Sequence, residues 1–302
     1  MVHGGRSSHN PHKDPAKHEL MRAKVAQVCK QGYLLPGKVV GGTHYFCVDK
    51  GEDDIRMVYN GTSCGLNDVL WAPRFGLPTV KQTLKSLLAG YCQCDLDVQK
   101  QFLNFPLHTY LREFSGVDGR GVRSSNQGDQ EWEDWERWVR NWMGLRDSPY
   151  RNLQWQVRLK LEVYGDRKAL GNHYHWDRVE FNLPGSKGYR SDLPWVMKTR
   201  VDEHLAAEIF VYVDDVRATG HSPRLTQAAA WAYAAGCSRR GVQDASRKRT
   251  SPSDTPGPWA GTVTHTEGGC VLGMVSQVKW DKTKLLIAEL GKMIPTHKAD
   301  QQ

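Results

Sequence analysis

Residues 207–222 read AEIFVYVDDVRATGHS, and this stretch decides the fold. Residues 209–213 are β-branched or aromatic, the composition of a buried strand. They run into the adjacent carboxylates of Asp214 and Asp215, and a second strand-like run extends over residues 216–220. We therefore predict a β-hairpin with an acidic pair at its tip. Adjacent carboxylates repel each other and resist desolvation, so either a solvated turn or a bound divalent cation explains the pair.

A second acidic stretch, YCQCDLDV at residues 91–98, favours the cation. Alternate side chains of a strand share a face, so its apolar members should face a core while Asp95 and Asp97 face a cleft. Mg²⁺ is bound by a few carboxylates in near-octahedral geometry, and phosphate oxygens complete the shell. Two strands that bring Asp97 beside the acidic hairpin tip would supply such a site.

Four stretches resemble motifs of reverse transcriptases and occur in the order found in that family. Tyr-Val-Asp-Asp at 212–215 resembles the catalytic box, and DVQKQF at 97–102, continued by LNFPL, resembles the first acidic motif. Residues 53–80 are similar to the fingers segment. Residues 143–150, MGLRDSPY, resemble the Gly-Leu-x-x-(Ala/Ser)-Pro motif that lies between the two acidic ones. The resemblance covers roughly residues 40–260.

The resemblance implies an α+β fingers-and-palm polymerase fold with an antiparallel palm sheet and with the thumb absent or truncated. We expect a disordered basic tail at residues 1–14 and a fingers-and-palm domain at residues 15–294. That domain should contain an insertion of short strands at about residues 165–206, and a second tail should follow at residues 295–302.

The resemblance also implies a reaction, RNA-directed DNA synthesis by an enzyme of a retrotransposon-like element. Asp97, Asp214 and Asp215 would hold two Mg²⁺ ions, with Mn²⁺ as a substitute. Lys248, in the basic cluster at residues 247–249, would protonate the leaving pyrophosphate. The implied partners are an RNA or DNA template with its primer, and deoxynucleoside triphosphates.

Four further residues match nucleotide-binding positions of the family. By position, Lys50 and Arg56 would hold the triphosphate, since a point charge and a bidentate fork both suit phosphate. Phe102, five residues beyond Asp97, would lie under the sugar and block a 2′-hydroxyl. Gly144 would let the backbone approach the template and the nucleotide closely. A solvated charged turn at Lys50 and Arg56, and a core side chain at Phe102, are the structural alternatives.

Composition bounds the class of protein. The 302 residues carry a net charge of +8 and a pI of about 9.1, which favours a polyanionic partner. No apolar run of transmembrane length and no signal-peptide pattern is present, so we expect an intracellular protein of the nucleus or cytoplasm that is not membrane-bound. Seven scattered cysteines indicate reduced thiols without a zinc site or a disulfide. His173 and His175 are a slight indication of metal binding.

The spacing of apolar residues, and the residues that begin or end helices, predict several other elements. The tryptophans between residues 132 and 142 recur at helical spacing with acidic residues between them, which favours a helix packed on the core over stacking on bases. A second helix should begin at Ser148, with Leu153, Val157 and Leu161 as its apolar stripe. Further helices are predicted over residues 16–31, 222–236 and 281–294, and a hairpin over residues 259–277.

Two other functions compete with catalysis of DNA synthesis. A degenerate retroelement remnant would bind nucleic acid without catalysis, and Lys100, a cation three residues beyond Asp97, supports it together with the missing thumb. A metal-dependent nuclease would use the same aspartates. It would explain neither Phe102 nor the motif at residues 143–150.

Overall fold

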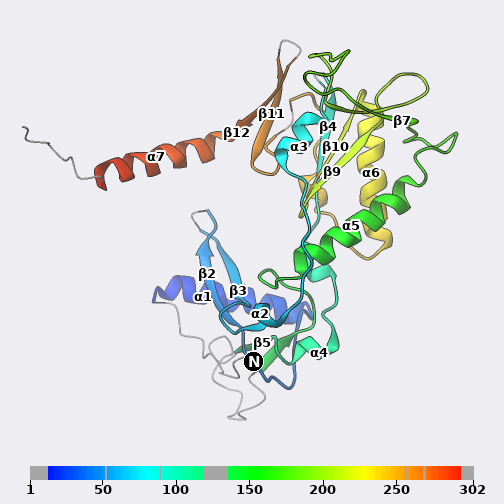
Figure 1. Ribbon diagram of the computed structural model, residues 1–302. Helices are drawn as coiled ribbons and strands as arrows, with labels where there is room; N and C mark the ends of the chain where they lie inside the picture. The colour runs from blue at the N-terminus through cyan, green and yellow to red at the C-terminus, as the bar shows by residue number, and fades with distance from the viewer. Residues whose placement is uncertain are drawn as a thin grey trace, which may run out of the picture. The chain divides into compact units, whose positions relative to one another are not determined.

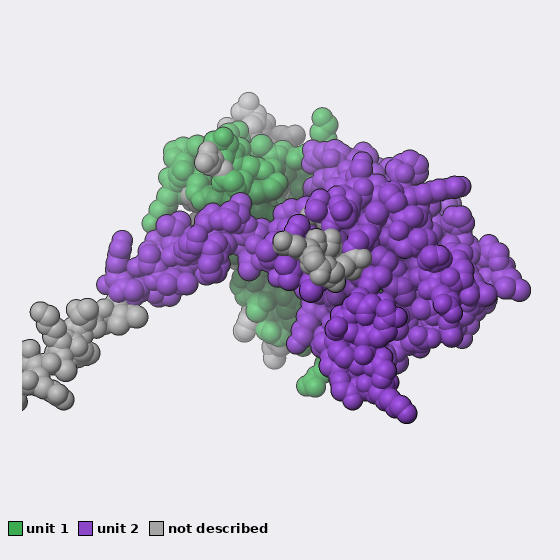
Figure 2. Space-filling model, turned by 90° about the horizontal axis from the view of Figure 1, so that it is seen from above, with its two compact units in different colours: residues 1–76, 100–158 green, residues 77–99, 159–302 purple. Residues whose placement is uncertain are grey.

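The computed structural model of the protein describes six stretches of the chain: residues 13–51, 53–88, 90–118, 135–255, 257–267 and 270–293. The predicted tails therefore lie outside the described residues, apart from Lys13 and Asp14. The chain divides into two compact units, which Figure 2 colours separately. Unit 1 comprises residues 1–76 and 100–158, and unit 2 comprises residues 77–99 and 159–302.

Unit 1 combines a helix, a β-hairpin and a three-stranded antiparallel sheet in the order β1-β6-β5 (Figure 1). Asp14 caps the first helix, because its side chain accepts hydrogen bonds from the backbone of Ala16 and Lys17. The predicted helix over residues 16–31 is confirmed. The elements are α1 (Pro15–Lys30), β1 (Leu34–Pro36), β2 (His44–Asp49), β3 (Ile55–Asn60), α2 (Leu66–Val69), η1 (Gln101–Asn104), α4 (Thr109–Arg112), β5 (Gly116–Asp118), β6 (Trp135–Trp138) and the start of α5 (Ser148–Tyr164).

The tryptophan-rich segment forms a strand, so the predicted helix is wrong. Residues 135–138 are β6, which pairs with β1 on one side and β5 on the other. Trp135, Trp138 and Trp142 are all buried, as predicted, and the ring of Tyr59 meets Trp138 edge-on at 4.8 Å. Aromatic side chains suit a buried strand, and pairing on both edges outweighs a helical spacing of apolar residues. Trp132 lies outside the described residues.

Helix α5 begins at Ser148 as predicted but buries a different face. Val157 and Leu161 are 51% and 67% exposed, whereas Asn152 and Gln156 are buried. The apolar stripe is therefore not the buried face of this helix, although Leu153 is half-buried. The polar face can be buried because Oδ1 of Asn152 accepts hydrogen bonds from the side chains of Gln101 and Gln156.

Unit 2 is built on a three-stranded antiparallel sheet in the order β4-β10-β9 (Figure 1). Its elements are α3 (Val80–Lys85), β4 (Cys92–Asp97), the end of α5, β7 (Arg178–Phe181), β8 (Val196–Thr199), β9 (Glu208–Tyr212), β10 (Asp215–Gly220), α6 (Pro223–Arg239), η2 (Ser246–Lys248), β11 (Thr262–Glu267), β12 (Cys270–Val275) and α7 (Gln277–Met293). The antiparallel hairpin β7–β8 lies within residues 165–206, where short strands were expected. The predicted hairpin near residues 259–277 is confirmed as β11–β12, and α7 begins four residues before its predicted start at Asp281.

Helix α6 packs against β4 and β10 and completes the core of unit 2. Ala229, Ala230 and Tyr233 of this helix are buried. The helix was predicted to end at Gly236, but it continues to Arg239. A Cβ atom at Gly236 would lie 2.3 Å from a methyl group of Val163, so this glycine permits close packing of two helices instead of ending one. The chain is thus a mixed α/β protein with small antiparallel sheets.

Two features concern the whole described chain. No helix in the stretches given above combines the length and the apolar character that a membrane span requires. All seven cysteines lie in the described stretches, none of them forms a disulfide there, and three are buried.

Candidate functional site

The acidic hairpin predicted from residues 207–222 is present. Strands β9 and β10 are antiparallel, and Tyr212 pairs with Asp215, which leaves Val213 and Asp214 as a two-residue turn. Val213 has a φ of +56°, in the left-handed region that β-branched residues rarely occupy. Such strain costs about 1–3 kcal/mol and is concentrated at functional sites, where the surrounding structure enforces it.

Strand β4 brings the third carboxylate to the same end of the sheet. Asp97 is the antiparallel partner of Asp215, so their Cβ atoms are roughly 4.5–5.5 Å apart. The backbone N–H of Val98 donates to the carbonyl oxygen of Asp214 at 2.9 Å and ties the end of β4 to the turn. The structure therefore brings Asp97, Asp214 and Asp215 together.

The three carboxylates influence one another. The pKa of Asp215 is raised to about 6, first by burial and then by the negative charges of Asp214 and Asp97. Lys248 opposes this effect: its Nζ lies 2.5 Å from Oδ2 of Asp97. Like charges facing each other across a strand pair are destabilising, so a cation at this end of the sheet relieves the repulsion.

Lys248 reaches Asp97 because its segment runs along β4. The backbone N–H of Ala245 donates to the carbonyl of Asp97 at 2.7 Å, and that of Thr250 donates to the carbonyl of Asp95 at 3.1 Å. The side chain of Lys248 is 53% exposed, whereas that of Asp97 is 13% exposed. The lysine is therefore held at the carboxylates by its backbone while its side chain stays open to solvent.

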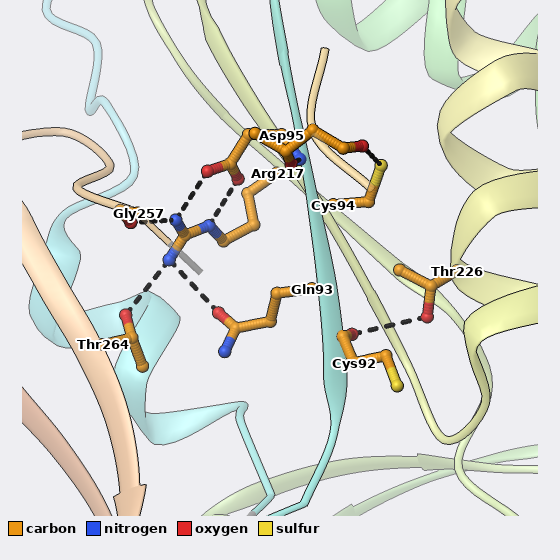
Figure 3. Close-up of polar contacts among 9 residues, drawn as sticks. Cys92, Gln93, Cys94, Asp95, Arg217, Thr226, Gly257 and Thr264 are labelled. Carbon is orange, nitrogen blue, oxygen red and sulfur yellow. Dashed lines mark hydrogen bonds and ion pairs between the residues drawn. The ribbon is translucent and has the colours of Figure 1, made fainter. Parts of the chain in front are cut away.

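Arg217 was not anticipated from the sequence, and it changes the role of Asp95 (Figure 3). Its guanidinium is fully buried and donates through Nε and Nη2 to both oxygens of Asp95, at 2.6 and 2.7 Å. Nη1 donates to Gln93 at 3.2 Å and to Thr264 at 3.1 Å, and Nη2 also donates to the carbonyl of Gly257 at 2.9 Å. The expectation that Asp95 faces an open cleft is wrong, because this carboxylate neutralises a buried arginine.

The strand register could have predicted that Arg217 pairs with Asp95. Once Asp215 is opposite Asp97, antiparallel pairing puts Arg217 opposite Asp95, two residues further along each strand. The guanidinium also lies 5.4 Å from the ring centroid of Trp259, a cation–π contact. The face that carries the catalytic candidates therefore continues into a buried polar network.

Lys50 and Arg56 lie on the β2–β3 hairpin of unit 1. The Nζ atom of Lys50 is 3.4 Å from Asp54, which also pairs with Lys24 at 2.9 Å. The pKa of Asp54 is lowered to about 2, chiefly by the hydrogen bond from Lys24. Asp54 is therefore held by two lysines of unit 1. Arg56 has no hydrogen-bond or ion-pair partner for its side chain within the described stretches.

Phe102 and Gly144 have different surroundings in unit 1. Phe102 lies in η1 and is only half-buried, while its neighbour Leu103 packs against the core. Gly144 has a φ of +109°, and a Cβ atom there would lie 2.1 Å from the carbonyl oxygen of Tyr59. A glycine is required here because the backbone of Tyr59 approaches closely. The sequence had led us to expect a close approach of the template and the nucleotide instead.

The predicted site residues divide between the two units. Lys50, Arg56, Phe102 and Gly144 belong to unit 1, whereas Asp97, Asp214, Asp215 and Lys248 belong to unit 2. The carboxylates and the lysine form the candidate site that the structure assembles.

The donor set at this site suits a hard cation in its chemistry. Three carboxylates offer oxygen ligands of the kind that Mg²⁺ prefers, with positions left for phosphate oxygens. In the described part of the chain, no group of three or more His, Cys, Asp or Glu residues has atoms already arranged to hold a metal ion. The ammonium group of Lys248 supplies the positive charge beside Asp97 instead.

Comparison of the fold with solved structures identifies its architecture. The foamy viral protease-reverse transcriptase in complex with double-stranded DNA matches 94% of this chain with a TM-score of 0.60 and 14% identity. The native protease-reverse transcriptase of prototype foamy virus matches 91% with a TM-score of 0.55 and 15% identity. The chain has a reverse transcriptase-like fold. It spans 40% and 29% of the length of these two proteins.

The reverse transcriptase-like fold agrees with the resemblance inferred from the four ordered motifs. No protein-family model matches the sequence. No curated protein matches it either. At identities of 14% and 15%, the likeness concerns the fold, and the chemistry rests on the residues of this chain.

Proposed function

We propose that the protein catalyses template-directed nucleotidyl transfer, as an RNA-directed DNA polymerase of a retroelement. What supports the proposal is the cross-strand pair of Asp97 and Asp215, with Asp214 in the adjoining turn, within a reverse transcriptase-like fold. In this proposal the β4-β10-β9 sheet is the palm and the β2–β3 hairpin belongs to the fingers.

In the proposed reaction the 3′-hydroxyl oxygen of a primer bonds to the α-phosphorus of a deoxynucleoside triphosphate. The bond between the α-phosphorus and its bridging oxygen breaks, pyrophosphate leaves, and the hydroxyl proton passes to solvent. Asp97, Asp214 and Asp215 would hold two Mg²⁺ ions, or Mn²⁺, which when bound favour ionisation of the hydroxyl and neutralise phosphate charge. Lys248, already at the carboxylates, would donate a proton to the leaving pyrophosphate.

Residues of unit 1 complete the proposal. Lys50 and Arg56 would neutralise the triphosphate, and the guanidinium of Arg56, which has no partner among the residues that the structure describes, is available for two parallel hydrogen bonds to it. The half-buried ring of Phe102 would occupy the space of a 2′-hydroxyl. The net charge of +8 favours a template and primer as partners.

The second candidate function is nucleic-acid binding without catalysis. The ion pair between Lys248 and Asp97 favours it, because the lysine neutralises a carboxylate that catalysis would assign to a metal. Lys100 no longer supports it. The Nζ atom of Lys100 donates to Gln31 at 2.6 Å and lies 5.2 Å over the ring of Tyr33, so an interaction within unit 1 accounts for this cation.

Primer extension with Mg²⁺ on RNA and DNA templates tests the proposal. Asp214→Asn should lower the extension rate by on the order of 10²–10³-fold, because metal-based charge stabilisation is worth several kcal/mol. Template binding by the variant should stay at the wild-type level. The exposed Asp192→Asn, which removes the same charge, should extend normally.

The outcomes separate the candidates. Absence of extension by the wild type, together with binding whose log–log salt slope is roughly −0.9 per duplex phosphate neutralised, would support the non-catalytic function. Cleavage of an unprimed substrate would indicate a nuclease. A wild-type protein that neither extends primers nor binds nucleic acid would remove both proposals.

A further inference from the structure

A second polar site lies at the far end of β10 from the carboxylates. A pocket of about 460 Å³ is formed by residues of the 165–206 segment and by the start of α6. Strand β10 rises roughly 3.3 Å per residue, so His221 is roughly 20 Å along the chain direction from Asp215. The charged and imidazole groups that line the pocket are His173, His175, Arg200, Asp202, His221 and Arg224.

The start of α6 leaves donors free at this pocket. Pro223 has no N–H, the N–H of Leu225 donates to Oγ of Ser222, and that of Thr226 donates to the carbonyl of Ser222. Neither the backbone N–H nor the guanidinium of Arg224 has a partner in the described part of the chain. The first turn of a 17-residue helix adds a partial positive charge at the same place.

A second arginine adds to the positive charge. Arg200 donates through Nη1 to the carbonyl of His173 at 3.4 Å, and its Nε is 3.4 Å from Oδ1 of Asp202. The carboxylate of Asp202 also accepts the N–H of His204 at 3.2 Å. The one carboxylate of the pocket is thus already engaged, and Arg224 leaves an excess of positive charge.

Two imidazoles carry unused polar atoms. Nδ1 of His221 lies 3.3 Å from the carbonyl oxygen of Leu205; because a carbonyl only accepts, Nδ1 carries the hydrogen and Nε2 is left for another partner. His175 is 8% exposed, with Nε2 2.5 Å from Asp177, while its Nδ1 lacks a hydrogen-bond partner among the described residues. Nδ1 of His175 is enclosed, so Nε2 of His221 is the imidazole nitrogen that this pocket offers to a ligand.

We infer that this pocket binds a phosphate group. An arginine fork and a free backbone N–H at a helix start both suit phosphate oxygens, whereas two arginines disfavour a cation. No three residues of metal-binding type converge here in the stretches that the structure describes. A volume of about 460 Å³ exceeds that of a phosphate ion and has room for part of an attached nucleoside. The phosphate comes from a 5′-phosphorylated nucleic-acid end or from a free nucleoside monophosphate.

Calorimetric titration with inorganic phosphate in EDTA tests the inference on the full chain. Arg224→Gln should raise the Kd at least tenfold, because it removes a guanidinium that has no partner among the described residues. His221→Asn should also weaken binding, since its amide can replace Nδ1 but not Nε2. Arg239→Gln, which removes the same charge at the other end of α6, should change the Kd less than twofold.

The site does not depend on the carboxylates. Asp214→Asn should therefore bind phosphate like the wild type, so a failure of primer extension would leave this inference standing. Equal weakening by Arg224→Gln and Arg239→Gln, or the absence of saturable binding by the folded wild type, would overturn it.

Two oligonucleotides of one sequence, with a 5′-phosphate or a 5′-hydroxyl, distinguish the sources. A preference for the phosphorylated strand that Arg224→Gln abolishes would assign the pocket to a nucleic-acid end. Equal binding of the two strands, with saturable binding of a nucleoside monophosphate that Arg224→Gln weakens, would assign it to a free nucleotide.

Discussion

Asp215 on β10 lies directly opposite Asp97 on β4, and Asp214 precedes it in the strained turn. Antiparallel pairing thus holds two like charges face to face where β4 ends and β10 begins. Such an arrangement is destabilising unless a cation accompanies it, so the geometry has consequences for stability as well as for catalysis.

The first prediction concerns pH. Burial and the neighbouring carboxylates raise the pKa of Asp215 from 3.8 to about 6, so its contribution to stability is present below about pH 4 and lost as the pH rises through 6. The rise in pKa corresponds to at most about 3 kcal/mol, and partial exposure reduces this to roughly 1–2 kcal/mol. In EDTA, the unfolding free energy of the wild type should therefore fall relative to Asp215→Asn between pH 4 and pH 7. Parallel pH profiles of the two proteins in urea unfolding would contradict this.

The second prediction concerns the buried arginine. Arg217→Met should lower the unfolding free energy by about 3–5 kcal/mol, because it leaves Asp95 as an uncompensated charge. The double variant Arg217→Met with Asp95→Leu should lose less than the sum of the single variants, by roughly 0.5–3 kcal/mol.

A matched surface pair serves as the control for Arg217. Arg190 and Asp192 have the same 2.6 Å nitrogen–oxygen distance, but both side chains are exposed. Arg190→Met should leave urea unfolding unchanged within error, since exposed pairs are screened by solvent. Equal effects of Arg217→Met and Arg190→Met would show that the buried network has no special weight.

The third prediction concerns Gly144. Alanine there would combine a left-handed φ with a Cβ atom 2.1 Å from the carbonyl of Tyr59, so Gly144→Ala should cost about 2–5 kcal/mol. Gly188 has a φ of +87° with nothing within 4 Å of its position for a Cβ atom. Gly188→Ala should therefore cost only the backbone strain, about 1–2 kcal/mol. Thermal unfolding of both variants measures the difference, and similar losses would mean that the approach to Tyr59 relaxes easily.

The fourth prediction rests on the proposed polymerase function. Phe102→Ala should relax discrimination against ribonucleotides, and Phe102→Tyr should retain it, because the discrimination depends on ring volume. Since Phe102 is half-buried, its truncation should cost less stability than the roughly 3–5 kcal/mol typical of a core phenylalanine. A Phe102→Ala protein that is badly destabilised and still rejects ribonucleotides would assign this residue a structural role.

Local composition correctly predicted those helices and strands whose interaction partners are close in the sequence. The β9–β10 hairpin follows from the apolar run that ends at Asp214, and α6 follows from Ser222 and Pro223 at its start. The motif order additionally predicted that Asp97 and Lys248 lie near this hairpin. For the hairpin and α6 the deciding interactions lie within one element or between adjacent ones, whereas the positions of Asp97 and Lys248 followed only from the motif order.

The errors arose where partners distant in the chain decide the outcome. β6 is a strand because β1 and β5 pair with both of its edges, which no local spacing of tryptophans reveals. Helix α5 turns Asn152 inward because Gln101 supplies a hydrogen bond. Arg217 is buried because its acceptors come from three separate segments, so its role depends on strand register and not on composition.

The acceptors of Arg217 also have an order in time. Asp95 and Gln93 precede it in the chain, but Thr264 follows it by 47 residues. At translation rates of 5–20 residues per second, roughly 2–10 seconds separate synthesis of the arginine from synthesis of its last partner. A nascent chain that already contains Asp97, Asp214 and Asp215 therefore still lacks Thr264, an acceptor of the buried Arg217 guanidinium. The β4-β10-β9 sheet and its neighbours can fully enclose this charge only after the β11 segment has left the ribosome.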